Sequence, residues 1–123
     1  MNTNLINVQV LALLGDAVFS LYIREEILKS GINNSKKFQA KSIEYVSAKG
    51  QVKILEELTQ KNILTEEELD IVKRGRNNKK ESHPKNTEII TYKLSTGFEA
   101  LIGHLYLTNK ERLQEILQTI EVK

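Results

Sequence analysis

The stretch from Leu11 to Ile23 constrains the fold more than any other part of the sequence. Its 13 residues are apolar nearly all round, and Asp16 is the only charge among them. Because such a helix belongs in a protein core, we predict a central helix from about residue 5 to residue 30, buried on several sides. Thirteen residues are too few to span a membrane. No Lys or Arg precedes the stretch, so it is not a signal peptide, and we expect a cytoplasmic protein.

The rest of the chain also favours helices. It contains one proline and six glycines, and no alternating run of β-branched residues long enough for a sheet. Gly31 suits the end of the first helix, because glycine accepts the left-handed conformation found there. We therefore predict a single all-α domain of 123 residues. Its further helices are expected at about 35–45 and 47–62 (as one helix or two), 65–76, 87–107 (continuous or broken near Ser95) and 109–121, with a polar loop at 77–86.

Thr65 marks the clearest helix start. Its hydroxyl can cap the helix while Glu68, three residues later, reaches back to form a capping box. In the helix before it, Val52, Leu55 and Leu58 form an inward stripe.

Charge is distributed unevenly along the chain. The segment 73–85 holds six basic residues and Glu81, a net charge of +5, whereas the rest of the chain carries −3 of the total of +2. A concentrated basic segment on a mildly acidic body points to an anionic partner. The alternative is a solvated loop without a partner.

Two carboxylates, Asp16 and Glu99, stand among apolar residues. A buried carboxylate loses hydration unless a cation or hydrogen-bond donors replace it. Gly15 and Gly97 lie one and two positions before them, so we expect a hydrated ion to approach the backbone there. The alternatives are that Asp16 lies on the wet face of its helix and that Glu99 belongs to a first helical turn.

These carboxylates favour magnesium if they bind a metal. The chain has no cysteine, which excludes disulfides and thiolate ligands. Magnesium is held by few carboxylates, because it keeps several water molecules and takes substrate phosphate oxygens as further ligands.

Several motifs resemble one known family. Leu14–Val18 (Leu-Gly-Asp-Ala-Val) and Phe98–Gly103 (Phe-Glu-Ala-Leu-Ile-Gly) are similar to the two acidic signature motifs of the ribonuclease III catalytic domain. Further segments resemble its small bacterial branch, Mini-ribonuclease III: Val46–Lys49, Leu64–Glu68, Lys73–Asn78 and Pro84–Thr87 with Tyr92. The resemblance covers nearly the whole chain.

The resemblance implies an all-α, metal-dependent endoribonuclease that hydrolyses double-stranded RNA to 5′-phosphate and 3′-hydroxyl ends. Asp16 and Glu99 would be both the catalytic residues and the ligands of Mg²⁺, with Mn²⁺ able to substitute. The family acts as a homodimer, and the favoured substrate of the branch is the stem flanking precursor 23S ribosomal RNA. We expect RNA contacts from a basic loop at about 73–87, through Lys73, Arg74, Arg76, Asn77, Lys79, Lys80, Lys85 and Asn86.

The sequence departs from the wider family at two acidic positions. Ala12 and Thr96 stand where ribonuclease III has further acids, four residues before Asp16 and three before Glu99. These spacings place each missing acid on the same helix face as the remaining one. We therefore expect one tightly held ion rather than a permanent pair. The double-stranded-RNA-binding domain of longer members also has no counterpart after Lys123; both departures are features of the Mini branch.

Two other functions stay open from the sequence. Loss of the acids at positions 12 and 96 would suit a non-catalytic RNA-binding protein with a degenerate site. The basic segment would also suit a helical adaptor that binds an acidic protein. His104 is five residues beyond Glu99 and off its helix face, so we expect a core or interface histidine.

Overall fold

The computed structural model describes residues 1–78 and 88–123. Within these ranges the chain forms helices and no strand, which confirms the all-α prediction. The elements are η1 (Thr3–Leu5), α1 (Val8–Lys29), α2 (Ser35–Val46), α3 (Ala48–Gln60), α4 (Glu66–Arg76), α5 (Ile89–Thr108) and α6 (Lys110–Gln118).

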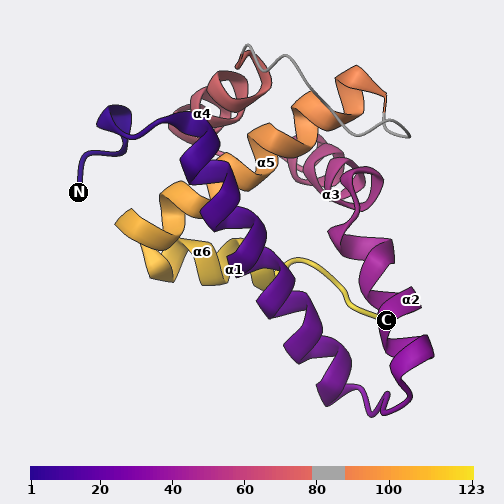
Figure 1. The fold of residues 1–123 in the computed structure, drawn as a ribbon. Coiled ribbons are helices and arrows are strands. Elements are labelled where there is room, and N and C mark those ends of the chain that lie inside the picture. Colours follow the sequence, from indigo (N-terminus) through magenta and orange to yellow (C-terminus); the bar gives the residue numbers. More distant parts are fainter. Residues whose placement is uncertain (79–87) are drawn as a thin grey trace.

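Helices α1 and α5 cross at the centre of the molecule (Figure 1). Each carries a glycine at the crossing. A Cβ atom on Gly15 would lie 2.7 Å from the carbonyl carbon of Glu99, and one on Gly103 would lie 3.0 Å from that of Leu11. Both distances lie well inside van der Waals contact, so the two backbones touch because neither glycine has a side chain.

The main core is built around this crossing. Phe19 of α1 and Phe98 of α5 are fully buried and meet edge to face, with ring centroids 5.1 Å apart and planes at 87°. Edge-to-face packing is a favoured geometry for aromatic pairs. Ile116 of α6 and Leu55 of α3 join the same cluster. Because Phe98 directly precedes Glu99, the core contact fixes the turn of α5 that carries this carboxylate.

Helix α4 packs along α5 through a second pair of glycines. A Cβ on Gly75 would lie 2.7 Å from the Cα of Gly97. At the start of α4 the predicted capping box is confirmed: Thr65 Oγ1 accepts from the Glu68 backbone, and Glu68 Oε1 accepts from the Thr65 backbone. The Glu68 carboxylate also binds Arg112 of α6 through two hydrogen bonds of 2.8 Å, and this guanidinium lowers its pKa. The pair joins α4 to α6, which lie apart in sequence.

The helix boundaries confirm most of the prediction and correct it in detail. Gly31 has φ of 96° and ends α1 as expected. The first helix begins at Val8 rather than near residue 5, because Asn7 caps it by accepting from the Gln9 backbone at 2.8 Å. Helix α5 is continuous through Ser95, whose hydroxyl donates to the carbonyl of Tyr92 at 2.8 Å. This local bond satisfies the hydroxyl within the helix.

One prediction about α1 is wrong: it is not buried on several sides. Its inner face packs on α5, but an outer row of apolar side chains is exposed: Val10 (55%), Leu13 (71%) and Leu21 (60%). Helix α1 is therefore apolar nearly all round because it has two apolar faces: one is packed against the rest of the chain, and the other is exposed. No helix in the described part of the chain is long and apolar enough to cross a membrane.

Candidate active site

The crossing of α1 and α5 brings together the backbones that carry the two predicted carboxylates. Asp16 directly follows Gly15, and the position of a Gly15 Cβ falls against the backbone of Glu99. The two signature motifs therefore meet in space although they lie near opposite ends of the chain. This close approach is the geometric basis of the candidate site.

Asp16 is exposed to solvent. Of the two placements that the sequence left open, burial among apolar residues is excluded, since Asp16 and its neighbours Leu13 and Ala17 are all exposed. The alternative placement on the wet face of the helix is the one found. The Asp16 carboxylate is therefore accessible from solvent and needs no buried partner to stabilise its charge.

Glu99 lies in the middle of α5 and is half-buried. A first-turn role is therefore wrong, because α5 begins ten residues earlier, at Ile89. Gln51 of α3 donates from Nε2 to Glu99 Oε2 at 3.1 Å. A neutral donor stabilises the ionised carboxylate without cancelling its charge.

The glycines beside the carboxylates do not open the backbone to a ligand, so that expectation is corrected. Gly15 faces the backbone of α5, and a Cβ on Gly97 would lie 2.5 Å from the carbonyl oxygen of Val72 in α4. Both glycines are required by helix packing. Their effect on the site is indirect, because they set how close the carboxylate-bearing helices come.

The positions that lack acids are filled from within the fold. Ala12 and Thr96 are 6% and 7% exposed, and the Thr96 hydroxyl donates to the carbonyl of Tyr92 at 3.0 Å. Among the described residues there is no group of three or more His, Cys, Asp or Glu side chains arranged to hold a metal. Asp16 and Glu99 therefore remain the two candidate carboxylates of the site.

The basic residues that the structure describes belong to the last turn of α4 and its cap, not to a loop. Lys73 and Asn77 are exposed, and Arg76 donates from Nε to Asn77 Oδ1 at 3.2 Å. The other predicted RNA contacts lie outside the described residues: Lys79, Lys80, Lys85 and Asn86.

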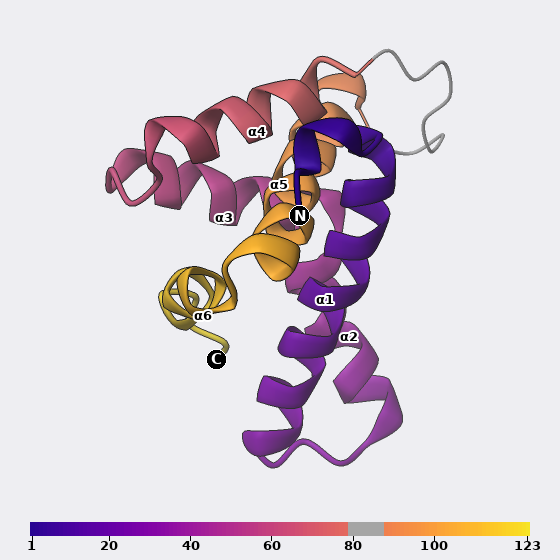
Figure 2. The ribbon, with the colours of Figure 1, turned by 90° about the vertical axis from the view of Figure 1, so that its left-hand side faces the viewer.

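Arg74 has a structural role that the sequence did not suggest. Its guanidinium donates to the carbonyl of Ile6 at 2.6 Å and to that of Thr3 at 3.3 Å. Thr3 is also bound through its hydroxyl to His104 Nδ1 at 2.6 Å, and burial lowers the pKa of this histidine. Arg74 and His104 together hold the segment before α1 against α4 and α5. The ribbon in Figure 2 shows the N-terminal segment passing in front of α5. His104 is therefore a packing residue, as predicted.

Gln51 is the residue of this region that the sequence analysis overlooked. A signal for it existed: it precedes Leu55 by four residues and Leu58 by seven, so it shares their inward stripe. A polar residue in register with an apolar stripe is expected to be buried with a specific partner.

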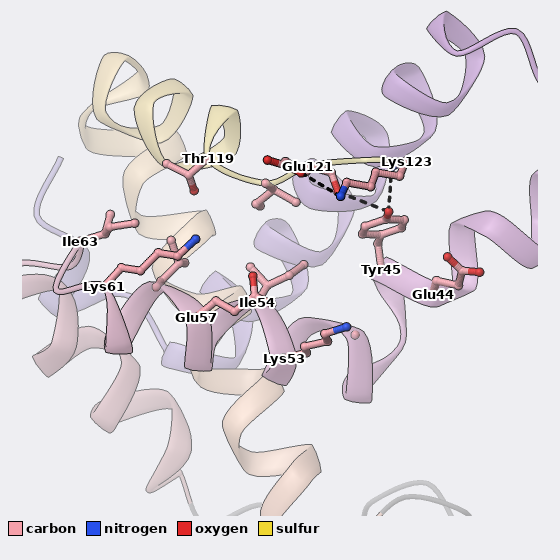
Figure 3. A pocket seen from close by; sticks show the side chains of 13 residues that line it. Glu44, Tyr45, Lys53, Ile54, Glu57, Lys61, Ile63, Thr119, Glu121 and Lys123 are labelled. Carbon is pink, nitrogen blue, oxygen red and sulfur yellow. Dashed lines mark hydrogen bonds and ion pairs between the residues drawn. The ribbon is translucent and has the colours of Figure 1, made fainter.

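A cavity of about 590 Å³ lies away from these carboxylates, beside α3 and the C-terminal segment (Figure 3). Lys53, Lys61 and Lys123 line it together with three glutamates, so its charges balance. The hydroxyl of Tyr45 donates to the carbonyl of Glu121 at 3.3 Å and accepts from the Lys123 backbone at 3.0 Å. Neither Asp16 nor Glu99 contributes to its lining.

Comparison with known proteins assigns the chain to a family. The family model described as the ribonuclease III domain matches residues 9–110, which include both carboxylates. A Mini-ribonuclease 3 from Streptococcus pneumoniae is 42% identical over 117 residues, covering 94% of this chain and 91% of the relative. Another from Brevibacillus brevis is 48% identical over 116 residues, covering 94% and 85%.

A solved structure agrees with the sequence relatives. The crystal structure of a protein from Fusobacterium nucleatum superposes with a TM-score of 0.84 at 32% identity, covering 97% of this chain and 95% of that one. The helical architecture is therefore shared over nearly the whole length of both proteins. The chain belongs to the ribonuclease III family of endoribonucleases, among relatives named Mini-ribonuclease 3.

Proposed function

We propose that this protein hydrolyses phosphodiester bonds of double-stranded RNA with Asp16 and Glu99 as its catalytic carboxylates. The observation that carries the proposal is the crossing of α1 and α5, which brings the two signature motifs together beside an exposed Asp16. A duplex is too wide to enter a closed pocket, so a carboxylate that cuts it has to lie at an accessible surface. The products carry 5′-phosphate and 3′-hydroxyl ends, as the family resemblance implies.

The donor set of the site fits magnesium, with manganese as a substitute. Two carboxylates, one exposed and one half-buried, leave most coordination positions to water and to phosphate oxygens, which is how Mg²⁺ is commonly bound. When bound by Asp16 and Glu99, the ion supplies Lewis-acid activation of a phosphate oxygen and of a water molecule.

The side chains of the chain divide the remaining work. Asp16 presents its charge to solvent, where the RNA backbone arrives, and Glu99 is held from behind by Gln51. The close backbone contact at Gly15 holds the two helix segments that carry the carboxylates together before RNA binds. Such preorganisation avoids a reorganisation step during the reaction.

We further propose that the protein acts as a homodimer. Duplex RNA presents two antiparallel strands related by a local two-fold axis, and a symmetric dimer presents one site to each. The outer row of α1 (Val10, Leu13 and Leu21) is an uncovered apolar surface on the helix that carries Asp16. A Leu13→Glu variant is expected to sediment as a monomer and to lose double-strand cleavage; a dimer in that variant would show that the interface lies elsewhere.

RNA binding is assigned to the basic end of α4 and the residues that follow it, at about 73–87. Duplex RNA is recognised largely through phosphates, 2′-hydroxyls and shape, a task suited to Lys, Arg and Asn donors. Lys73 and Asn77 are exposed and accessible for it. Following the resemblance, the cellular substrate is the stem flanking precursor 23S ribosomal RNA, processed in the cytoplasm.

The decisive experiment is cleavage of a duplex RNA with Mg²⁺ and with EDTA. The parent protein is expected to cut only with the ion, whereas Asp16→Asn and Glu99→Gln keep the fold and RNA binding but lose nearly all cleavage. A variant that cuts within about tenfold of the parent, roughly 1.4 kcal/mol in the barrier, would remove that residue from the mechanism. RNA binding without any cleavage by the parent would identify the non-catalytic alternative that the residues at positions 12 and 96 suggest.

A further inference from the structure

Gln51 is buried at the point where three helices meet. Its side chain is 1% exposed and lies in the first turn of α3, just after the corner between α2 and α3. The amide nitrogen Nε2 donates to Glu99 Oε2 at 3.1 Å and to the carbonyl of Val46 at 3.2 Å. It thereby joins the end of α2 to the carboxylate of α5.

The amide oxygen of Gln51 has no such partner. Its Oε1 is fully buried and makes no hydrogen bond, a state that it shares with Ser42 Oγ in the described part of the chain. Turning the amide over would place Oε1 against the Glu99 carboxylate and the Val46 carbonyl, two acceptors, so the orientation is fixed by its neighbours. A buried polar atom without a partner destabilises the folded state, so stability alone does not favour glutamine at this position.

The neutral amide donor explains why a glutamine, rather than a charged residue, suits this position. A lysine or arginine beside Glu99 would neutralise its charge and compete with a metal ion for it. An amide donor holds the carboxylate in one orientation and, because it is neutral, does not itself cancel the carboxylate's charge. This matters most in a site where the chain supplies two carboxylates.

We propose that Gln51 is a positioning residue that holds the Glu99 carboxylate, through its Nε2–H, in the orientation that binds the divalent ion. The inference rests on the proposed function of Glu99 and adds a third side chain to the site. Partners that orient metal ligands are tightly coupled to function, and their loss commonly lowers metal affinity or activity about 10- to 100-fold.

Replacement of Gln51 by methionine tests the proposal, since methionine has a similar volume and no donor. Metal-free protein is titrated with Mn²⁺ in the absence of RNA, and bound Mn²⁺ is followed by electron paramagnetic resonance. Gln51→Met is expected to bind Mn²⁺ about tenfold more weakly than the parent. Its cleavage should reach half of the maximal rate at a correspondingly higher Mg²⁺ concentration, with RNA affinity unchanged in EDTA.

Ser42→Ala is the matched control. It also removes a buried atom without a partner, but Ser42 lies on α2 and forms no hydrogen bond to Glu99. Its Mn²⁺ affinity and Mg²⁺ dependence should equal those of the parent. Thermal unfolding without metal verifies that each variant is folded, and Gln51→Leu takes the place of Gln51→Met if the latter unfolds.

The outcomes separate this proposal from the one on which it rests. If the parent binds Mn²⁺ and a folded Gln51 variant binds it within twofold, the positioning role is overturned while the function of Glu99 stands. If the parent binds no Mn²⁺ and Mg²⁺ does not support cleavage, the proposed function fails and this inference falls with it.

Discussion

Replacing Gly15 by alanine tests whether the α1–α5 crossing creates the site. The added Cβ would lie 1.7 Å from the carbonyl oxygen of Glu99, whereas real Cβ atoms essentially never come within 3.0 Å of another heavy atom. The helices therefore have to separate by more than 1 Å at this point. No side chain can move aside to avoid this, because the obstructing atom belongs to the backbone of α5.

The sign and size of the effect follow from two opposing terms. In a helix with free space, Gly→Ala stabilises by about 0.5–1 kcal/mol. Overpacking of a core contact destabilises by about 1–3 kcal/mol or more, and an obstructing backbone lies at the upper end. We therefore expect a net loss of about 2 kcal/mol. A displacement near 1 Å between catalytic groups lowers the rate about 100-fold, so cleavage should fall further than stability alone would explain.

Urea denaturation and single-turnover cleavage on folded protein measure the two effects separately. Gly31→Ala is the control, because Gly31 has φ of 96° and open space around the position of a Cβ. That variant should lose about 1–2 kcal/mol of stability through backbone strain and cut RNA like the parent. A Gly15→Ala protein as stable and as active as the parent would refute the close crossing.

Four further variants test contacts and charges elsewhere in the fold. Glu68→Gln should destabilise by about 2 kcal/mol at pH 7, because it removes the carboxylate that accepts two hydrogen bonds from Arg112. The folded pKa of Glu68 lies below its usual 4.5, so this stabilisation exists above that pH and is lost as the pH falls through the folded pKa. The urea midpoints of parent and variant should therefore converge in acid. Arg74→Met should lower the free energy of unfolding, measured by urea denaturation, by about 1–2 kcal/mol, since two carbonyls lose their donor. Lys73 is exposed, so Lys73→Ala should change stability by less than about 0.5 kcal/mol. The same variant should reduce the slope of log binding constant against log salt concentration by about 0.7–0.9, the contribution of one phosphate contact. Tyr22→Phe should lower stability by about 1 kcal/mol, because the hydroxyl donates to the Leu117 carbonyl at 3.1 Å; no change would show that water satisfies this carbonyl equally well.

Local sequence signals predicted the helices well because each depends on neighbouring residues. The capping box at Thr65 and the left-handed stop at Gly31 are satisfied within a few positions, and both were confirmed. The start at Val8 was missed because apolar residues lie on both sides of the capping residue Asn7, so the apolar pattern does not show where the helix begins.

Tertiary roles were harder to predict, since they depend on contacts far along the chain. In the sequence, Gly15 suggests space beside Asp16 for a ligand. Only the position of α5 shows that the Glu99 backbone fills this space. Arg74 reads as one more cation in a basic segment, although its partners precede it by about seventy residues. The candidate carboxylates could be singled out from the sequence because each is the single charge in an apolar motif, which is a local signal.

The crossing of α1 and α5 also bears on when the enzyme becomes active during its own synthesis. A ribosome makes the chain from its N-terminus, so Asp16 emerges long before Glu99 and Gly103. Until α5 has left the ribosome, Phe19 lacks its aromatic partner and Gly15 has no backbone to pack against. A nascent chain therefore carries only half of the proposed site, and cleavage of double-stranded RNA has to wait until α5 has been made.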